Sequence, residues 1–138
     1  MKSSHVLLPT VLLILGVALC RGADGGAHEL FNGNDLTGWE TYLGPRYDEQ
    51  KKEFAGDPVG LNQDPDGIFR VVEVDGAPAI RVSGVVWGAV SNLAEYENYH
   101  LRLQFKWGER RFPPRATARR DSGVLYHSVG PHAAGWFF

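Results

Sequence analysis

The sequence has very little cysteine, because Cys20 is its single cysteine. A domain formed by the residues after it therefore contains no intramolecular disulfide, and its stability has to come from apolar burial. The sequence also lacks a strong charge of either sign, since its formal net charge is only -2 at pH 7. A near-neutral chain has little electrostatic attraction for a polyanion, which argues against nucleic acid as the main partner.

The sequence also lacks internal repeats, and no apolar run reaches the roughly 20 residues that a membrane-spanning helix needs. Its longest apolar run, 6–19, follows a short start that carries Lys2. A positive start, a short apolar core and small residues after it are typical of a secretory signal peptide. We therefore expect residues 1–23 to be a signal peptide and the protein to be exported to the periplasm or the cell exterior. We expect no integral membrane span after signal removal.

Two processing routes stay open at this N-terminus. Small side chains between Ala18 and Ala23 suit cleavage by a signal peptidase. The sequence Val-Ala-Leu-Cys resembles a lipoprotein box, in which Cys20 would carry a lipid anchor. An apolar helix buried in the domain is the alternative to a signal.

The composition of the remaining chain, 24–138, favours a single β domain. The whole sequence contains 17 glycines, 8 prolines, 4 tryptophans, 5 tyrosines and 7 phenylalanines, which suits a turn-rich β fold better than a helical bundle. Many short strand-like segments predict an all-β sandwich or jelly roll of two antiparallel sheets. A long surface excursion is expected over 44–67, a hairpin turn over 75–78 and one helical turn around 92–96. The expected strands are 29–31, 39–43, 68–74, 79–82, 85–90, 99–107 and 123–129.

The clearest strand pattern is the alternation of apolar and polar residues over 99–107. The apolar face, which we expect to lie in the core, consists of Leu101, Leu103, Phe105 and Trp107. The polar face consists of His100, Arg102, Gln104 and Lys106. This polar face is either a solvated outer surface or a row of side chains that hydrogen-bond the hydroxyl groups of a sugar.

The turn at 121–123 and the segment after it hold the best candidates for catalysis. Histidine titrates near neutral pH, so His127 suits proton transfer. Asp121 could orient this histidine, accept a hydrogen bond from a sugar hydroxyl or hold a metal, and Tyr126 is a candidate for substrate binding. A purely structural role for His127 and Asp121 is the alternative. No cofactor follows with certainty, and a divalent metal held by Asp121, His127 and His132 stays possible.

Two further patterns have both a functional and an ordinary interpretation. Residues 62–73 resemble a calcium loop, but Asp64-Pro65-Asp66-Gly67 is also a strong β-turn sequence and no flanking helices are visible. The arginines of the second pattern lie around a proline pair, so we expect a solvated basic loop, with the covering of a sugar site as the alternative. These arginines are Arg110, Arg111, Arg115, Arg119 and Arg120.

Three segments together carry a resemblance to a known family. They are ELFNGNDLTGW at 29–39, EYENYHLRLQFKWG at 95–108 and RDSGVLYHSVGPH at 120–132. In this order they resemble the bacterial 3-keto-disaccharide hydrolase domain family. The resemblance implies a concanavalin A-like jelly roll that acts on a carbohydrate substrate outside the cytoplasm. Domains of this family are longer, so we expect the chain to be incomplete at its C-terminus.

The resemblance also implies hydrolysis of 3-keto glycosides by elimination and hydration. No carboxylate pair suited to ordinary glycoside hydrolysis can be placed in the sequence. His127 and Asp121 are the candidate catalytic residues. The candidate substrate-binding residues are His100, Arg102, Gln104, Lys106 and Tyr126. The alternatives are a non-catalytic, lectin-like glycan-binding module and a structural surface domain.

Overall fold

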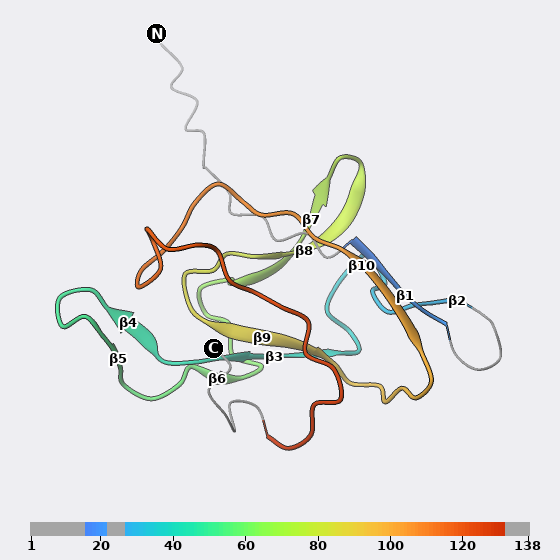
Figure 1. Cartoon of the computed structure of the whole chain (residues 1–138), viewed down its shortest axis with the longest axis horizontal. Helices are drawn as coiled ribbons and strands as arrows, with labels where there is room; N and C mark the ends of the chain where they lie inside the picture. Colours follow the sequence, from blue (N-terminus) through green and yellow to red (C-terminus); the bar gives the residue numbers. More distant parts are fainter. Residues whose placement is uncertain (1–15, 22–26, 132–138) are drawn as a thin grey trace, which may run out of the picture.

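The computed structural model describes residues 16–21 and 27–131 (Figure 1). This part of the chain contains strands and no helix, so the predicted all-β class is confirmed. No helix in it is long and apolar enough to cross a membrane. The strands are β1 (Gly16–Arg21), β2 (Ala27–Glu29), β3 (Trp39–Leu43), β4 (Arg46–Asp48), β5 (Glu53–Ala55), β6 (Gly60–Leu61), β7 (Phe69–Val74), β8 (Ala77–Val82), β9 (Gly88–Asn92) and β10 (His100–Gln104).

The described strands form four small antiparallel sheets. The order is β10-β1-β2 in the first sheet and β6-β3-β9 in the second, and β4-β5 and β7-β8 are two-stranded. Every pairing is antiparallel, which is consistent with the predicted sandwich. In Figure 1, β3 and β9 run side by side through the middle of the molecule, and the β7–β8 hairpin projects from it.

The core lies where β3 and β7 meet the segment that leads into β9. Leu43, Ile68, Phe69 and Val86 are buried together in one cluster. Leu43 and Ile80 are completely inaccessible to solvent. Each such side chain removed from water contributes roughly 1.5–3 kcal/mol to the stability of a domain that has no disulfide.

The β7–β8 hairpin and β3 were predicted with nearly the observed bounds. Asp75 and Gly76 have positive φ angles of 51° and 79°, as a two-residue turn of type I′ requires. The register pairs Val74 with Ala77 directly across this turn. The β8 strand is therefore two residues longer at its start than 79–82.

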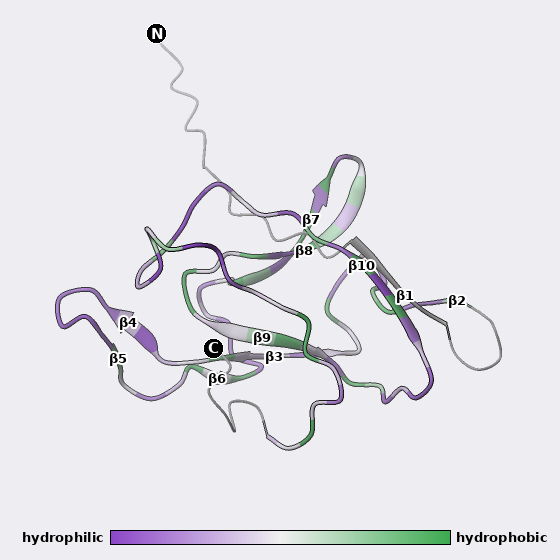
Figure 2. Ribbon diagram, viewed as in Figure 1, coloured by the Kyte–Doolittle hydropathy of each residue, from purple (hydrophilic) through white to green (hydrophobic). Residues whose placement is uncertain are grey.

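The segment 44–67 was expected to be a long surface excursion, and most of it is exposed, but it also contains the β4–β5 hairpin and β6. The side chain of Asp48 closes the hairpin by accepting hydrogen bonds from the backbone N–H groups of Gln50 and Lys51, at 2.9 and 3.0 Å. Strands of two or three residues are too short to show periodicity, so the pattern missed them. The hairpin is largely hydrophilic (Figure 2).

The expected strand at 123–129 was wrong. Residues 122–126 are neither strand nor turn, and His127 has a positive φ of 55°, which interrupts extended backbone. No strand in the described part of the chain pairs with this segment. Without a partner its backbone N–H and C=O groups form no ladder, and Val124, Leu125 and Val129 are exposed.

Other boundaries differ by smaller amounts. The helical turn expected at 92–96 is a bend, in which the Asn92 side chain accepts a hydrogen bond from the backbone N–H of Ala94 at 3.0 Å. The first strand after the expected signal is β2 rather than 29–31, and β9 begins three residues later and ends two residues later than 85–90. Boundaries are the least certain part of a strand prediction from sequence.

The expectation that Phe105 and Trp107 lie in the core was wrong, because β10 ends at Gln104. Its ladder with β1 begins at His100 and ends where Gly16 pairs with Gln104. Beyond it Phe105 and Trp107 are 59% and 40% exposed and pack edge to face on each other. The β1 strand, which also pairs with β2, lies inside the expected signal peptide.

Candidate functional site

A cavity of about 420 Å³ lies between the start of β10 and the segment that follows residue 122. It brings together two stretches that are distant in the sequence. Its lining residues are Asn98, Tyr99, Leu101, Val124, Tyr126 and His127. We refer to it as the histidine cavity.

Aromatic rings contribute three of the six residues that line the histidine cavity. The His127 ring lies edge to face with both the Tyr99 ring and the Tyr126 ring, with centroid distances of 6.4 and 5.4 Å. Tyr96 packs against Tyr99 in the same manner, at 6.2 Å. Tyrosine combines an apolar ring with a polar tip, which suits the alternating C–H and hydroxyl surface of a sugar.

Two lining residues have backbone conformations that are uncommon for side chains other than glycine. Asn98 and His127 have φ angles of 49° and 55°. The left-handed region is sparsely populated by such residues, and when they occur they tend to gather at functional sites. Asparagine and histidine are among the side chains that adopt this region most readily, and Lys52, Asn62 and Asp75 also adopt it away from the cavity, so these angles shape the two lining segments and do not by themselves indicate function.

The structure places two of the predicted site residues, His127 and Tyr126, at this cavity. Asp121 is not among the lining residues, and its carboxylate lies 3.5 Å from the guanidinium of Arg115 on an exposed loop. The structure therefore does not bring Asp121 to His127. His132, the third member of the possible metal site, lies outside the described residues. No group of three or more His, Cys, Asp and Glu that could hold a metal occurs within 16–21 and 27–131.

The predicted substrate-binding row lies on a different surface. His100, Arg102 and Gln104 are exposed on one face of β10, whereas Leu101 of the opposite face lines the histidine cavity. Successive residues of a strand point to opposite faces, so this row cannot share the cavity. Lys106 is exposed beyond the end of the strand.

The arginine-rich loop is stabilised by its own guanidinium groups. Arg111 donates to the carbonyl of Ala118, and Arg115 donates to that of Arg119, both at 3.0 Å. Arg120 donates to the carbonyl groups of Gly108 and Glu109. These hydrogen bonds tie the arginine side chains to backbone carbonyl groups. The loop is mostly hydrophilic (Figure 2).

Asn98 and Tyr99 are the cavity residues that the sequence patterns did not single out. In the sequence, Tyr99 is the first residue of the expected strand 99–107, and Asn98 only precedes that strand. Only the fold brings them against residues 124–127. The one local signal is the tolerance of asparagine for the left-handed conformation, which is also common in ordinary turns.

Residues 26–137 match a family described as the 3-keto-alpha-glucoside-1,2-lyase-like domain. The chain belongs to this family. The resemblance carried by the three sequence segments is thereby confirmed, and both segments that form the histidine cavity lie within the matched range. The chain is therefore a carbohydrate-related domain. No curated protein and no solved structure was found to match it.

Proposed function

We propose that this domain cleaves 3-keto glycosides by elimination and hydration, with His127 as the base. One observation carries the assignment: the His127 imidazole lines a cavity and contacts two tyrosine rings, within a 3-keto-alpha-glucoside-1,2-lyase-like domain. An imidazole exchanges protons near neutral pH, which suits abstraction of a carbon-bound proton acidified by a ketone.

The chemistry needs one base and no oxidant. The ketone at C3 acidifies the proton at C2, and His127 removes it to give an enolate. The electron pair then forms the C1=C2 bond as the C1–O bond breaks, and the departing aglycone oxygen takes up a proton. Water adds to the resulting enone, with its hydroxyl at C1 and a proton returned to C2. The sum is hydrolysis, with the ketone regenerated.

The other cavity residues supply binding and stabilisation in this proposal. Tyr99 and Tyr126 present rings to the apolar face of the sugar. The Asn98 amide and the Tyr126 hydroxyl can donate a hydrogen bond to the C3 oxygen as negative charge develops on it. The exposed row of His100, Arg102 and Gln104, with Lys106 beyond it, remains our candidate for contacts with a distant part of a longer glycan.

Exchange of the C2 proton with deuterated water distinguishes elimination from direct displacement at C1. We expect His127→Ala to slow this exchange by roughly 10²–10⁴-fold, because a general base contributes about that much. Sugar affinity should change little. The control is His28→Ala, since His28 lies exposed on β2 and lines no part of the cavity. Full activity in the His127→Ala variant would show that this histidine is structural.

The second candidate is a non-catalytic glycan-binding module. It is favoured by the placement of Asp121, which pairs with Arg115 rather than orienting His127. A domain of this kind would bind 3-keto glycosides and their unoxidised parents through the tyrosine rings and convert neither. Binding of both forms without turnover of either would therefore decide for the module.

A further inference from the structure

A second cavity, of about 440 Å³, lies between β4, the turn at 64–67 and the β7–β8 hairpin. Its polar lining consists of Arg46, Arg70, Arg81, Asp66 and Ser83. We refer to it as the arginine cavity. It shares no lining residue with the histidine cavity.

Two of these arginines face each other across the hairpin. Arg70 of β7 is the direct cross-strand partner of Arg81 of β8. Like charges directly opposite each other on antiparallel strands destabilise the pair. Arg81 is half-buried and also takes part in another interaction. The hairpin thus places two guanidinium groups on neighbouring strands beside the cavity.

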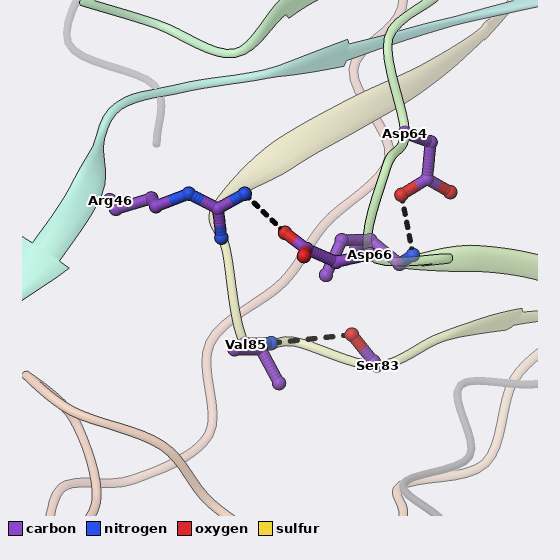
Figure 3. Close-up of polar contacts among 6 residues, drawn as sticks. Arg46, Asp64, Asp66, Ser83 and Val85 are labelled. Atoms are coloured by element: carbon purple, nitrogen blue, oxygen red, sulfur yellow. Dashed lines mark hydrogen bonds and ion pairs between the residues drawn. The ribbon is translucent and has the colours of Figure 1, made fainter.

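The third arginine reaches the cavity from β4. Arg46 forms an ion pair with Asp66, and Figure 3 shows its guanidinium extending across to that carboxylate. The two side chains are 52% and 42% exposed, so this pair contributes little to folding stability. Among the side chains that line the cavity, three carry a guanidinium group and one carries a carboxylate.

The turn before β7 is shaped to accommodate Arg70. Asp64 fixes the turn, because its carboxylate accepts hydrogen bonds from the backbone N–H groups of Ile68 and Phe69 at 2.6 and 2.9 Å. Gly67 has a positive φ of 60°, and a Cβ there would collide with the Arg70 guanidinium. Arg70 Nε donates to the Gly67 carbonyl at 3.3 Å. The glycine therefore lets this guanidinium lie across the turn, beside the cavity.

Ser83 adds a buried hydroxyl to the lining. It is only 6% exposed, and its oxygen accepts a hydrogen bond from the Val85 backbone N–H at 3.5 Å (Figure 3). Accepting this bond leaves the hydroxyl proton to donate. The cavity therefore combines cationic donors with a neutral donor and, in Asp66, an acceptor.

We propose that the arginine cavity binds an oxyanion group, a carboxylate or a sulfate, carried by a sugar. Planar guanidinium groups bind oxyanions through paired charge-assisted hydrogen bonds. A bound anion would also neutralise the Arg70–Arg81 repulsion. Ser83 and Asp66 would bind sugar hydroxyls next to the anion. This site is separate from the histidine cavity and gives the domain a preference for acidic glycans.

Calorimetric titration of the chain tests this preference. The probes are an oligogalacturonate, a sulfated oligosaccharide, the neutral counterpart of each, and inorganic sulfate. We expect the acidic oligosaccharides to bind at least about tenfold more tightly than their neutral counterparts, and Arg70→Gln to remove about 10–100-fold in affinity. The comparison of the two acidic probes identifies the preferred anion. Equal affinity for acidic and neutral sugars, or for inorganic sulfate and acidic sugars, overturns the proposal.

The stability of the same variant provides a second, independent readout. Without ligand, Arg70→Gln should raise Tm by about 1–4 °C, because it removes the cross-strand repulsion. Arg81→Gln should lower the affinity in the same direction. The matched control is Arg110→Gln, since Arg110 lies on the Phe112 ring outside the cavity and should leave affinity unchanged. A lower Tm with unchanged affinity in Arg70→Gln would show that the arginine pair is structural. His127→Ala should keep its affinity for acidic sugars, which separates this test from that of the proposed catalysis.

Discussion

Single aspartate and asparagine side chains organise the turns of this chain by accepting backbone N–H hydrogen bonds. Asp48 and Asp64 do so in the turns before β5 and β7. Asn32 does the same before β3, where its side-chain oxygen accepts hydrogen bonds from the backbone N–H groups of Asn34 and Asp35. Such residues can be identified in the sequence as turn formers.

The calcium-like spacing at 62–73 has an explanation in the same terms. The Asp64 carboxylate accepts hydrogen bonds from backbone N–H groups, and the Asp66 carboxylate pairs with Arg46.

One of these turns should titrate abnormally. The Asn32 amide donates to the Asp35 carboxylate at 2.7 Å, and the Thr37 backbone N–H donates to it at 2.8 Å, which together hold the pKa of Asp35 below its ordinary value. Since the folded state favours the ionised form, this contribution to stability is complete above the ordinary pKa of aspartate. It is lost as the pH falls through the lowered pKa.

We expect Asn32→Ala to raise the pKa of Asp35 towards its ordinary value, because it removes the largest cause of the shift. NMR titration of the Asp35 carboxyl carbon would measure it. The control is Asn34→Ala, because the Asn34 amide bonds the Asn32 carbonyl rather than this carboxylate. An unchanged Asp35 titration in Asn32→Ala would contradict the assigned cause.

The candidate site was predictable only in part, because only some of its residues carry a local signal in the sequence. His127 and Tyr126 stand out because their chemistry is visible in one short segment. Asn98 and Tyr99 have no such signal, because they join the site through the fold. Asp121 shows the opposite case: it lies six positions before His127 in the sequence, yet its carboxylate pairs with Arg115.

Among the elements, those with a strong local code were predicted and those that depend on a partner were not. The β7–β8 hairpin follows from β-branched residues around an Asp-Gly turn, and β3 has its predicted bounds. The alternation at 99–107 is just as regular, but the ladder with β1 stops at Gln104. The apolar segment at 123–129 forms no strand because no described strand pairs with it. An alternating pattern indicates that a segment is able to form a strand. Whether it does so depends on a partner strand from elsewhere in the chain.

The close approach of β9 to β3 depends on one glycine, which pairs directly with Leu43. A Cβ at Gly88 would collide with the Tyr42 carbonyl oxygen and lie 2.8 Å from a methyl carbon of Leu43. We expect Gly88→Ala to lower the free energy of unfolding by about 1–3 kcal/mol, because it overpacks the edge of the core. Gly123→Ala is the matched control, since a Cβ there meets nothing within 4 Å. Denaturant titration would measure both, and equal stability of the two variants would contradict this account.

At the scale of the whole molecule, removal of the expected signal peptide would change the β10-β1-β2 sheet. In the unprocessed chain β1 lies between β10 and β2, and it pairs with both. Its residues, Gly16–Arg21, lie within the proposed signal peptide. Cleavage between Ala18 and Ala23 would remove much or all of this strand. The mature protein would then have unpaired backbone groups on β10, and an open strand edge is a site for pairing with other chains.

Removal of the signal peptide should therefore change how well the backbone amides of β10 are protected from hydrogen exchange. We expect its backbone amides to exchange with deuterium at least about tenfold faster in a chain that starts at Asp24 than in the chain that starts at Met1, because they lose β1 as a partner. Amides of β9, which pair with β3, should exchange at the same rate in both. Mass spectrometry of the exported protein would first define its N-terminus. An intact Met1 would rule out processing. Equal exchange of β10 in the two chains would show instead that another segment takes the place of β1.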